Sequence, residues 1–292
     1  MAGNLQQQTA SYDVDAAGGA RWDGAMVSDE QTTENAPPAD RLRGNAAHYT
    51  RDAAEYDYAP SVDSELGQIE LRRAQLLLRL AGLDQPAPAG ENQGLVADFG
   101  IGGGQLAAMM AELGWRPLGL DIAWHNCARA RSERQALGDG KSGARFSAAD
   151  LYALPLPDGC VKAGVVSEVL EHLEEPGAAV KELGRVLQPG GVLVASCPYR
   201  EKLVWHLCIH CNQPTPANAH LHSVSESKMA GWMRDAGLEP GRAVFFNHKA
   251  LVAMRWNRRV RRLPYGLWRA GEAAALALWR KPYHFAMVGV KK

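Results

Sequence analysis

The sequence predicts an α/β fold in which helices cover both faces of a doubly wound, Rossmann-like sheet. Between residues 95 and 197, short apolar runs alternate with helical patterns at a regular pace. Four of the strand-like runs end in an acidic residue, and a glycine-rich turn follows the first of them. Such alternation is typical of parallel strands joined by right-handed crossovers. Ligands of these sheets bind beyond the carboxyl ends of the strands, where the acidic residues fall.

The composition is that of a globular protein. A chain of 292 residues is long enough to bury the core of one domain with appendages. Lysine plus arginine equals aspartate plus glutamate, at 32 each, and the five cysteines are an odd number, which argues against a disulfide framework. Because no signal-like N-terminal segment and no long apolar run is present, we expect a cytoplasmic protein that contacts membranes at most peripherally.

The chain begins with two segments of different character. Residues 1–40 are acidic and carry few large apolar side chains, which predicts a disordered tail. Residues 41–85 are expected to form a helical cap built around a helix at 65–82, with Arg72 on its solvent face. The predicted apolar stripe of this helix comprises Leu66, Ile69, Leu76, Leu77 and Leu80. Residues 86–292 are expected to form the principal domain.

The alternating region divides into five strands and three helices. The expected strands are 95–99, 117–122, 144–149, 161–167 and 191–197, and the expected helices are 103–113, 124–137 and 176–187. The acidic residues at the ends of the first four strands are Asp98, Asp121, Asp150 and Glu168. Because the carboxyl ends of parallel strands share one edge of a sheet, these side chains predict a polar ligand site there.

The turn after the first strand has the pattern Gly-x-Gly-x-Gly, at Gly100, Gly102 and Gly104. Glycines permit a positive φ and close approach of a ligand, and the free N–H groups of the next helix favour polar ligand atoms. Asp121 lies about twenty residues further on, where a carboxylate accepts hydrogen bonds from ribose hydroxyls. We therefore expect a nucleoside here. Gln105 stands where a dinucleotide fingerprint has its third glycine, which disfavours a nicotinamide dehydrogenase.

Further motifs follow this turn in order, and together they resemble the class I S-adenosylmethionine-dependent methyltransferases of the type 11 branch. The motifs are Asp98-Phe99-Gly100-Ile101-Gly102-Gly103-Gly104, Asp121-Ile122, Ala149-Asp150-Leu151 with Leu154-Pro155, Ser167-Glu168-Val169-Leu170-Glu171-His172 and Leu187-Gln188-Pro189-Gly190-Gly191. The resemblance covers about residues 45–290 and implies a site for S-adenosylmethionine. The residues of this site would be Asp98, Gly100, Gly102, Asp121, Ile122, Asp150, Leu151 and Glu168.

The resemblance also implies what these residues contact. Gly100 and Gly102 would approach the methionine part of the cofactor, and Asp121 would bind the ribose hydroxyls. Asp150 would accept from the adenine amino group, with Leu151 beside the ring.

The resemblance further implies a seven-stranded sheet whose last strand is antiparallel. Segments 242–247 and 285–290 are rich in residue types favoured in strands and are expected to form the closing hairpin. Two insertions then remain, at 199–224 after the fifth strand and at 250–282 between the last two strands.

Glu168, Glu171 and His172 are expected to form the catalytic, acceptor end of the active site. Two carboxylates and an imidazole within five residues suit a divalent cation such as Mg²⁺, Mn²⁺ or Zn²⁺. The triplet is similar to the E-x-x-E-H of the polyprenyl-catechol O-methyltransferases and of the small-RNA 2′-O-methyltransferases. That resemblance implies a metal held by the triplet and a later histidine, here His220 or His222. In the alternative, His172 acts without a metal, as a base.

A second metal hypothesis concerns the first insertion. Cys208, Cys211, His220 and His222 offer two thiolates and two imidazoles, which suit tetrahedral zinc. The His-x-His spacing is tighter than in common zinc fingers, so reduced cysteines without zinc remain the alternative. Because both metal hypotheses use the same histidines, the two sites cannot each hold all of their ligands.

The second insertion is basic and rich in tryptophan. Its arginines and tryptophans are Arg255, Arg258, Arg259, Arg261, Arg262, Arg269, Trp256, Trp268 and Trp279. Three interpretations are open: a helical lid packed on the core, contact with a membrane or amphiphile, and binding of single-stranded nucleic acid. No recognised nucleic-acid module is visible, so nucleic acid is the least favoured.

These motifs predict an S-adenosylmethionine-dependent methyltransferase that acts on a small-molecule acceptor. The favoured acceptor is an oxygen of a phenolic, catechol-like or amphiphilic metabolite. A phenol has a pKa of about 10, so it needs a cation or His172 to lose its proton near neutral pH. The alternatives are a C- or N-methyltransferase of a natural product, a nucleic-acid 2′-O-methyltransferase, and a zinc-stabilised binding module without catalysis.

Overall fold

The computed structural model describes residues 13–14, 20–21, 49–54, 60–88, 94–136, 143–207, 212 and 214–292. The chain divides into two units, residues 1–41 and 42–292. In the first unit, strand β1 (Asp13–Val14) pairs antiparallel with β2 (Ala20–Arg21). The rest of the predicted disordered tail lies outside the described residues, so that hypothesis stays a prediction.

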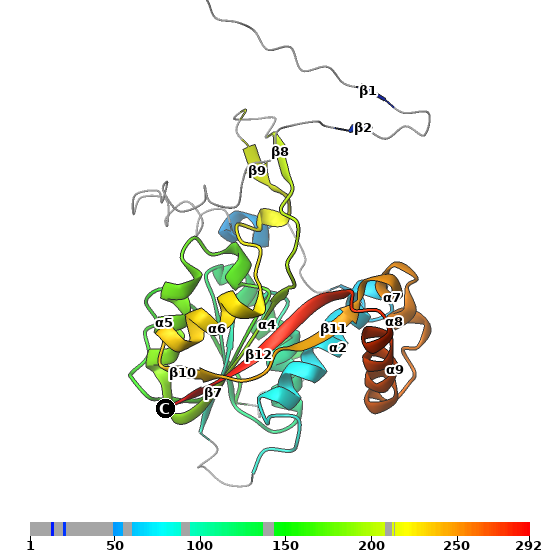
Figure 1. Cartoon of the computed structure of the whole chain (residues 1–292). Helices are drawn as coiled ribbons and strands as arrows, with labels where there is room; N and C mark the ends of the chain where they lie inside the picture. Colours follow the sequence, from blue (N-terminus) through cyan, green and yellow to red (C-terminus); the bar gives the residue numbers. More distant parts are fainter. Residues whose placement is uncertain are drawn as a thin grey trace, which may run out of the picture. The chain divides into compact units, whose positions relative to one another are not determined.

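An eight-stranded sheet runs through the second unit (Figure 1). Its strands are β3 (Leu95–Phe99), β4 (Pro117–Asp121), β5 (Arg145–Ala148), β6 (Val161–Ser167), β7 (Leu187–Pro198), β10 (Leu238–Pro240), β11 (Val244–His248) and β12 (Pro282–Lys291). Their spatial order is β5–β4–β3–β6–β7–β12, and β10 and β11 both pair with β12. The strands from β5 to β7 are parallel, whereas β12 runs antiparallel to β7. The predicted doubly wound sheet with an antiparallel end strand is confirmed.

The sheet has eight strands because the position beside β12 is divided between β10 and β11. Pro240 pairs with Gly289, whereas Val244 pairs with Ala286, so the register shifts by one residue between the two strands. Such a bulge suits this place, since Pro240 has no N–H to donate and the N–H of Gly241 bonds to the carbonyl of Val288 at 2.7 Å.

Helices cover both faces of the sheet. Figure 1 shows α5 (Pro176–Val186) and α6 (Glu226–Asp235) on one side and α2 (Glu65–Leu80) on the other. α3 (Gln105–Glu112) packs against α2, and α4 (Trp124–Ala136) packs against β4 and β5. Side chains of β7 alternate between the two cores: Leu193 and Ala195 join the α5–α6 side, and Val194 joins the α2–α3 side. This alternation is the pleat of a strand that is buried on both faces.

Helix α2 begins where the Ser64 hydroxyl accepts a hydrogen bond from the N–H of Gly67, at 2.9 Å. Ile69 and Leu77 of the predicted stripe are buried. Two predictions for this helix are wrong. Leu66 is half exposed, and Arg72 is buried rather than solvent-facing.

Arg72 is buried because the second insertion covers it. Its guanidinium donates to the carbonyl of Leu263 at 2.8 Å and lies over the ring of Trp268. The insertion comprises α7 (Lys249–Ala253), α8 (Trp256–Arg259) and α9 (Tyr265–Leu278), and it lies between β11 and β12. These three helices and their links, residues 249–281, are called the basic module below.

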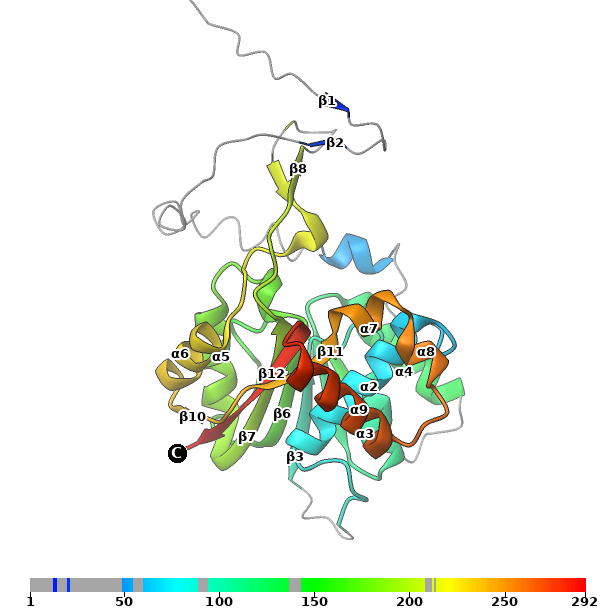
Figure 2. The same ribbon diagram turned by 45° about the vertical axis from the view of Figure 1, so that its right-hand side comes forward.

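The first insertion forms a hairpin and a short helical turn. Strands β8 (Trp205–Leu207) and β9 (Pro214–Pro216) pair antiparallel and extend away from the sheet in both views (Figure 1, Figure 2). The turn η2 (Ala217–Ala219) leads from β9 back to the sheet edge. Among the described residues, no helix is both long and apolar enough to cross a membrane.

The contact between α2 and the basic module can be tested at Glu65. Its carboxylate accepts hydrogen bonds from the N–H of Arg258 at 2.7 Å and from the side-chain amide of Asn257 at 2.8 Å. Asn257 is 1% exposed and in turn accepts from the indole N–H of Trp268. We expect Glu65→Ala to lower the free energy of unfolding by about 1.5–3 kcal/mol, because it removes the charged acceptor of the buried Asn257 amide.

Urea denaturation measures this loss. The matched control is Asp63→Ala, which removes only the exposed ion pair with Arg261 and should cost much less. Equal losses in the two variants would contradict the proposed importance of Glu65.

Candidate active site

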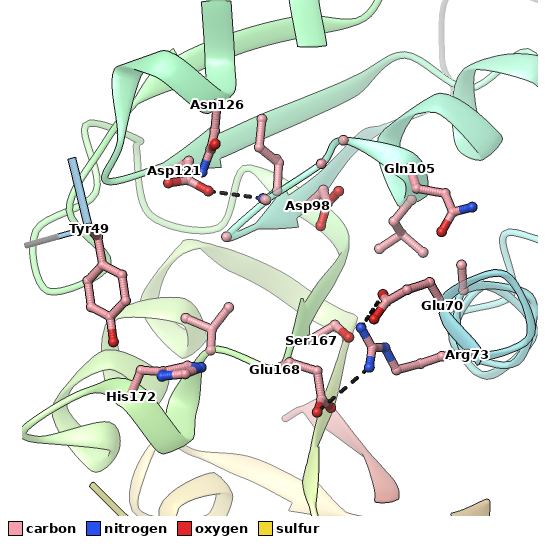
Figure 3. Close-up of a pocket in the computed structure, with 18 of the residues that line it drawn as sticks. Tyr49, Glu70, Arg73, Asp98, Gln105, Asp121, Asn126, Ser167, Glu168 and His172 are labelled. Carbon is pink, nitrogen blue, oxygen red and sulfur yellow. Dashed lines mark hydrogen bonds and ion pairs between the residues drawn. The ribbon is translucent and has the colours of Figure 1, made fainter. Parts of the chain in front are cut away.

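A cavity of about 1220 Å³ opens at the carboxyl ends of the parallel strands (Figure 3). Each residue predicted to bind the cofactor lines it: Asp98, Gly100, Gly102, Asp121, Ile122, Asp150, Leu151 and Glu168. His172 and His220 line the same cavity. The candidate cofactor residues and the candidate acceptor residues therefore share one space.

The glycine-rich turn brings bare backbone to the cavity wall. Gly100, Gly102 and Gly104 have φ values of 81°, 48° and 74°, a left-handed region that favours glycine. A β-carbon on Gly100 would lie 2.4 Å from Cγ2 of Val169. Side chains are thus sterically excluded at Gly100, and the wall there consists of main-chain atoms.

Asp121 is held at the end of β4 by this turn. Its Oδ2 accepts from the N–H of Gly102 at 3.1 Å, and its Oδ1 accepts from the N–H of Ala123 at 2.8 Å. Burial raises the pKa of Asp121, and these two hydrogen bonds oppose the rise. Figure 3 shows the carboxyl group of Asp121 at the cavity side of the glycine turn.

Asp150, which follows β5, also makes a local contact. Its side chain accepts a hydrogen bond from the N–H of Tyr152 at 2.9 Å.

Asp98 lies deeper, at the end of β3, and is 2% exposed. One oxygen accepts from the N–H of Ala107 in α3, at 3.2 Å. Burial raises the pKa of Asp98 to about 7; the hydrogen bond from Ala107 opposes this rise, and the charge of Asp121 adds to it. Asp98 thus ties the end of β3 to the first turn of α3.

Glu168 faces one guanidinium, one imidazole and one hydroxyl. Its Oε2 lies 3.2 Å from Nε2 of His284 and 3.7 Å from Nη1 of Arg73, and its Oε1 accepts from the Ser196 hydroxyl at 3.1 Å. Burial alone would raise its pKa, but His284 and Arg73 outweigh burial and lower the pKa to about 2. Figure 3 shows Arg73 reaching from α2 between Glu70 and Glu168. Glu168 is therefore a carboxylate that is already paired.

Glu171 has the opposite environment. It lies on the short turn η1 (Leu170–His172) and is 1% exposed. Within the described part of the chain, neither carboxyl oxygen has a hydrogen-bonding N–H or O–H partner. Burial, with the charge of Glu168 adding to it, raises the pKa of Glu171 well above its usual range, and the buried Cys197 thiol lies beside it. A buried carboxyl group whose nearest side-chain donor is a weakly hydrogen-bonding thiol calls for a ligand or a proton.

Glu171, His172 and His220 form a cluster that could hold a metal ion. One ligand atom from each lies within 4.8 Å of the other two. The backbone N–H of Leu221 donates to the carbonyl of Glu171 at 2.8 Å, which holds the end of the first insertion against η1. The first insertion thus supplies the third ligand.

Both histidines of this cluster are oriented through Nδ1. Nδ1 of His172 lies 3.2 Å from the carbonyl of Ala219, and Nδ1 of His220 meets the Glu201 carboxylate. Asn218 and Ala219 have φ values of 56° and 54°, so two left-handed residues turn this carbonyl toward His172. A carbonyl or carboxylate on Nδ1 fixes the tautomer in which Nε2 can bind a cation.

The structure separates the other candidate ligands from this cluster. Glu168 is paired with Arg73 and His284, as described. Nε2 of His222 lies 3.2 Å from the carbonyl of Glu174. Cys208 and Cys211 lie outside the described residues, so the four-ligand zinc hypothesis stays a prediction.

Two residues of the site come from segments that the sequence patterns did not connect with it. Arg73 belongs to α2, and His284 belongs to β12. Neither lies in a recognisable motif, and only the fold brings them to the cavity. Tyr49, in the helical residues 49–54, also lines the cavity; it packs edge-on against His172, and burial raises the pKa of its hydroxyl.

Known proteins share this architecture. Residues 97–195 match a family model described as a methyltransferase domain. The chain is 30% identical over 171 residues to the ubiquinone biosynthesis O-methyltransferase of Leptothrix cholodnii, covering 56% of this chain and 71% of that protein. It is 32% identical over 147 residues to a probable S-adenosylmethionine-dependent methyltransferase of Mycolicibacterium smegmatis, covering 49% of this chain and 51% of that protein. The match thus spans about half the length of the second relative.

A solved structure agrees with this match. The crystal structure of an S-adenosylmethionine-dependent methyltransferase from Aquifex aeolicus superposes with a TM-score of 0.53 at 17% identity, over 83% of this chain and 98% of that chain. This likeness shows the same α/β class of fold. The chain belongs to the class I S-adenosylmethionine-dependent methyltransferases, in the type 11 branch. The predicted resemblance is therefore confirmed.

The residues around the cavity fit S-adenosylmethionine. A β-carbon at Gly100 would collide with Val169, so this position has no side chain. Its main-chain atoms are therefore accessible to a ligand. Asp121 presents a carboxylate that two backbone N–H groups hold in one orientation. Such a carboxylate suits the two hydroxyls of a ribose.

The titration of Asp98 gives a test of its burial. The carboxyl pKa is about 3.9 in an unfolded chain and about 7 in the folded protein. Between these values the unfolded chain loses its proton while the folded protein keeps it, so the free energy of unfolding falls as the pH rises from about 4 to about 7. In Asp98→Asn this group cannot titrate. We therefore expect the free energy of unfolding of the variant to fall less over this pH range than that of the wild type, by up to about 4 kcal/mol.

Urea denaturation of the cofactor-free protein across this pH range measures the difference. Asp150→Asn is the control, since Asp150 is exposed, and its profile should parallel that of the wild type. A parallel profile for Asp98→Asn as well would contradict the raised pKa.

Proposed function

We propose that this methyltransferase transfers a methyl group to a small-molecule oxygen acceptor, a phenolic, catechol-like or amphiphilic metabolite. One observation carries the proposal: a single cavity is lined by the glycine turn with Asp121 and by two histidines of the Glu171–His172–His220 cluster. The printed name of the Leptothrix cholodnii relative, an O-methyltransferase, supports an oxygen acceptor.

The chain's own residues would do three things in this reaction. Bound S-adenosylmethionine supplies an electrophilic methyl group. The glycine turn and Asp121 would hold the cofactor in one position, so that acceptor and methyl group are aligned. Tyr49 and His172 would exclude water and orient the acceptor at the other end of the cavity. The remaining task is to remove the acceptor proton, because a phenol has a pKa of about 10.

We further propose that Glu171, His172 and His220 hold a divalent cation, either Mg²⁺, Mn²⁺ or Zn²⁺. The unpaired carboxyl group of Glu171 supports this, since a cation would satisfy it. Glu201 on His220 and the carbonyl of Ala219 on His172 supply the outer contacts that histidine ligands need. A bound cation would lower the pKa of an acceptor hydroxyl.

In the second candidate mechanism, His172 takes the proton without a cation. The position of His172 on the cavity wall supports it. C- or N-methylation of a natural product, 2′-O-methylation of a nucleic acid and a non-catalytic zinc module remain alternatives. Product analysis with labelled cofactor distinguishes these outcomes.

The location proposed for the protein is the cytoplasm, with peripheral contact to a membrane or amphiphile through residues 250–282. The arginines and exposed apolar side chains of the basic module support this contact.

Cofactor binding is expected to depend on Asp121. Asp121→Ala should weaken binding of S-adenosylmethionine by about 10- to 150-fold, which corresponds to about 1.5–3 kcal/mol for charged hydrogen bonds. Isothermal calorimetry measures the change. Asp158→Ala, which alters an exposed carboxylate away from the cavity, is the control. Tighter binding of NADH than of S-adenosylmethionine would overturn the cofactor assignment.

Cation binding is expected to require Glu171 and His220. Titration with Mn²⁺, followed by electron paramagnetic resonance, should show binding that Glu171→Ala and His220→Ala abolish. His222→Ala is the matched control and should retain binding. Glu201→Gln should weaken binding about 10- to 100-fold, because it alters only an outer contact.

Activity on a panel of phenols and catechols then distinguishes the two mechanisms. If the cation takes part, a chelator abolishes activity and a divalent cation restores it. Full activity in chelator and in Glu171→Ala, with only His172→Ala inactive, would leave the histidine mechanism instead.

A further inference from the structure

The face of α9 that points away from the sheet is apolar along its whole length. Its solvent-exposed residues are Gly266, Leu267, Ala270, Gly271, Ala273, Ala274, Ala277 and Leu278. Leu267 is 62% exposed and Leu278 is 89% exposed. A surface helix of a globular protein normally carries polar side chains on this face. This helix therefore presents to solvent a face suited to an apolar environment.

The two charged residues of α9 turn toward the protein instead. Glu272 is 1% exposed and accepts from the N–H of His248 at 3.0 Å. Arg269 lies 3.4 Å from Glu272 and donates to the carbonyl of Phe245 at 3.1 Å. The charges of the helix are thus used for packing, and none of them lies on the outer face.

Further apolar side chains of the basic module are exposed outside α9. Met254, Leu263 and Trp279 are 51%, 39% and 57% exposed, and they lie in the links around α8 and at the end of α9. Large exposed apolar surface is a mark of interaction sites.

This exposure does not come from a loosely packed module. Trp268, on the inner side of α9, is 1% exposed, and its indole N–H bonds to Asn257 at 2.9 Å. Arg72 of α2 donates to the carbonyls of Arg261 and Leu263. These contacts fix the inner side of the module on the protein, so the exposure of the outer apolar side chains does not come from a detached helix.

The same module carries strong positive charge. Residues 249–281 contain nine lysines and arginines and one acidic residue, the buried Glu272, in a chain of zero formal net charge. Arg261 pairs with Asp63 at 2.9 Å. For Arg258, Arg259 and Arg262, the described chain places no carboxylate within ion-pair distance, and all three are exposed. The surface therefore combines apolar side chains with unneutralised guanidinium groups.

We infer that the basic module docks on an anionic phospholipid membrane. The apolar face of α9, with Trp279, would enter the boundary between head groups and acyl chains, and the arginines would meet lipid phosphates. An anionic membrane suits both the apolar side chains and the arginines of this surface. A second copy of the chain would bring equal positive charges together, and single-stranded nucleic acid would need several exposed aromatic rings, whereas the face of α9 carries leucine, alanine and glycine.

The basic module also borders the active-site cavity. Val252, in α7 of the module, and Tyr283, in β12 just after it, both line the main cavity. The inference rests on the proposed function in one respect: an amphiphilic acceptor could pass from the membrane to this cavity.

Flotation of the full-length protein with vesicles tests the inference. Vesicles of phosphatidylcholine alone are compared with vesicles that also contain phosphatidylglycerol. We expect binding to the anionic vesicles, weakened by salt, and much weaker binding to the neutral ones. The double variant Leu267→Glu, Leu278→Glu and the double variant Arg259→Glu, Arg262→Glu should each bind about tenfold or more weakly.

Two exposed tryptophans provide a matched control. Trp279→Ser should weaken vesicle binding, whereas Trp124→Ser, at a site that is equally exposed but outside the module, should not. Calorimetry with S-adenosylmethionine should give the wild-type affinity for every variant, because none of these residues lines the cavity. This readout separates the membrane inference from the proposed catalytic function.

Three results would overturn the inference. The first is equal binding to neutral and anionic vesicles, or binding to neither. The second is wild-type vesicle binding in both double variants. The third is a concentration-dependent dimer that Leu267→Glu, Leu278→Glu disrupts without vesicle binding, which would make the face a contact between two copies.

Discussion

The chemistry of the site depends on how two carboxyl groups are buried at the end of β6. Glu168 and Glu171 are three residues apart, and Glu168 raises the pKa of Glu171. Two carboxylates this close cannot both remain charged without counter-charges. Arg73 and His284 lie against Glu168 and keep it ionised. Glu171 is left to carry a proton or to meet a cation, and this constraint gives His172 and His220 their importance.

Helix α2 connects this constraint with the basic module. Two adjacent residues of the helix reach different parts of the molecule: Arg72 donates to carbonyls of the basic module, and Arg73 reaches Glu168. Glu65, at the start of the same helix, accepts from the backbone and side chain of α8 residues. The position of the basic module and the charge around Glu168 therefore both depend on how α2 packs.

The cavity has two halves of different origin. The cofactor half is built from turns that directly follow β3, β4 and β5, so its geometry follows from the sheet. The acceptor half takes Tyr49 from the N-terminal cap, His220 from the first insertion and His284 from β12. Because those segments lie outside the parallel core, the acceptor half can differ between proteins that share the sheet.

The sequence by itself determined the layered sheet and the edge at which the proposed cofactor-binding residues meet, because both follow from local patterns. Glycine spacing and acidic strand ends alone predict that Gly100, Gly102 and Asp121 lie at one edge of the sheet. The predicted solvent side of α2 was wrong at Arg72, since the carbonyl that buries it lies 189 residues away. Only the tertiary structure decided that His220 rather than His222 joins Glu171 and His172, and that Arg73 and His284 pair with Glu168. Contacts between segments so far apart leave no periodicity in the sequence, so only the folded chain reveals them.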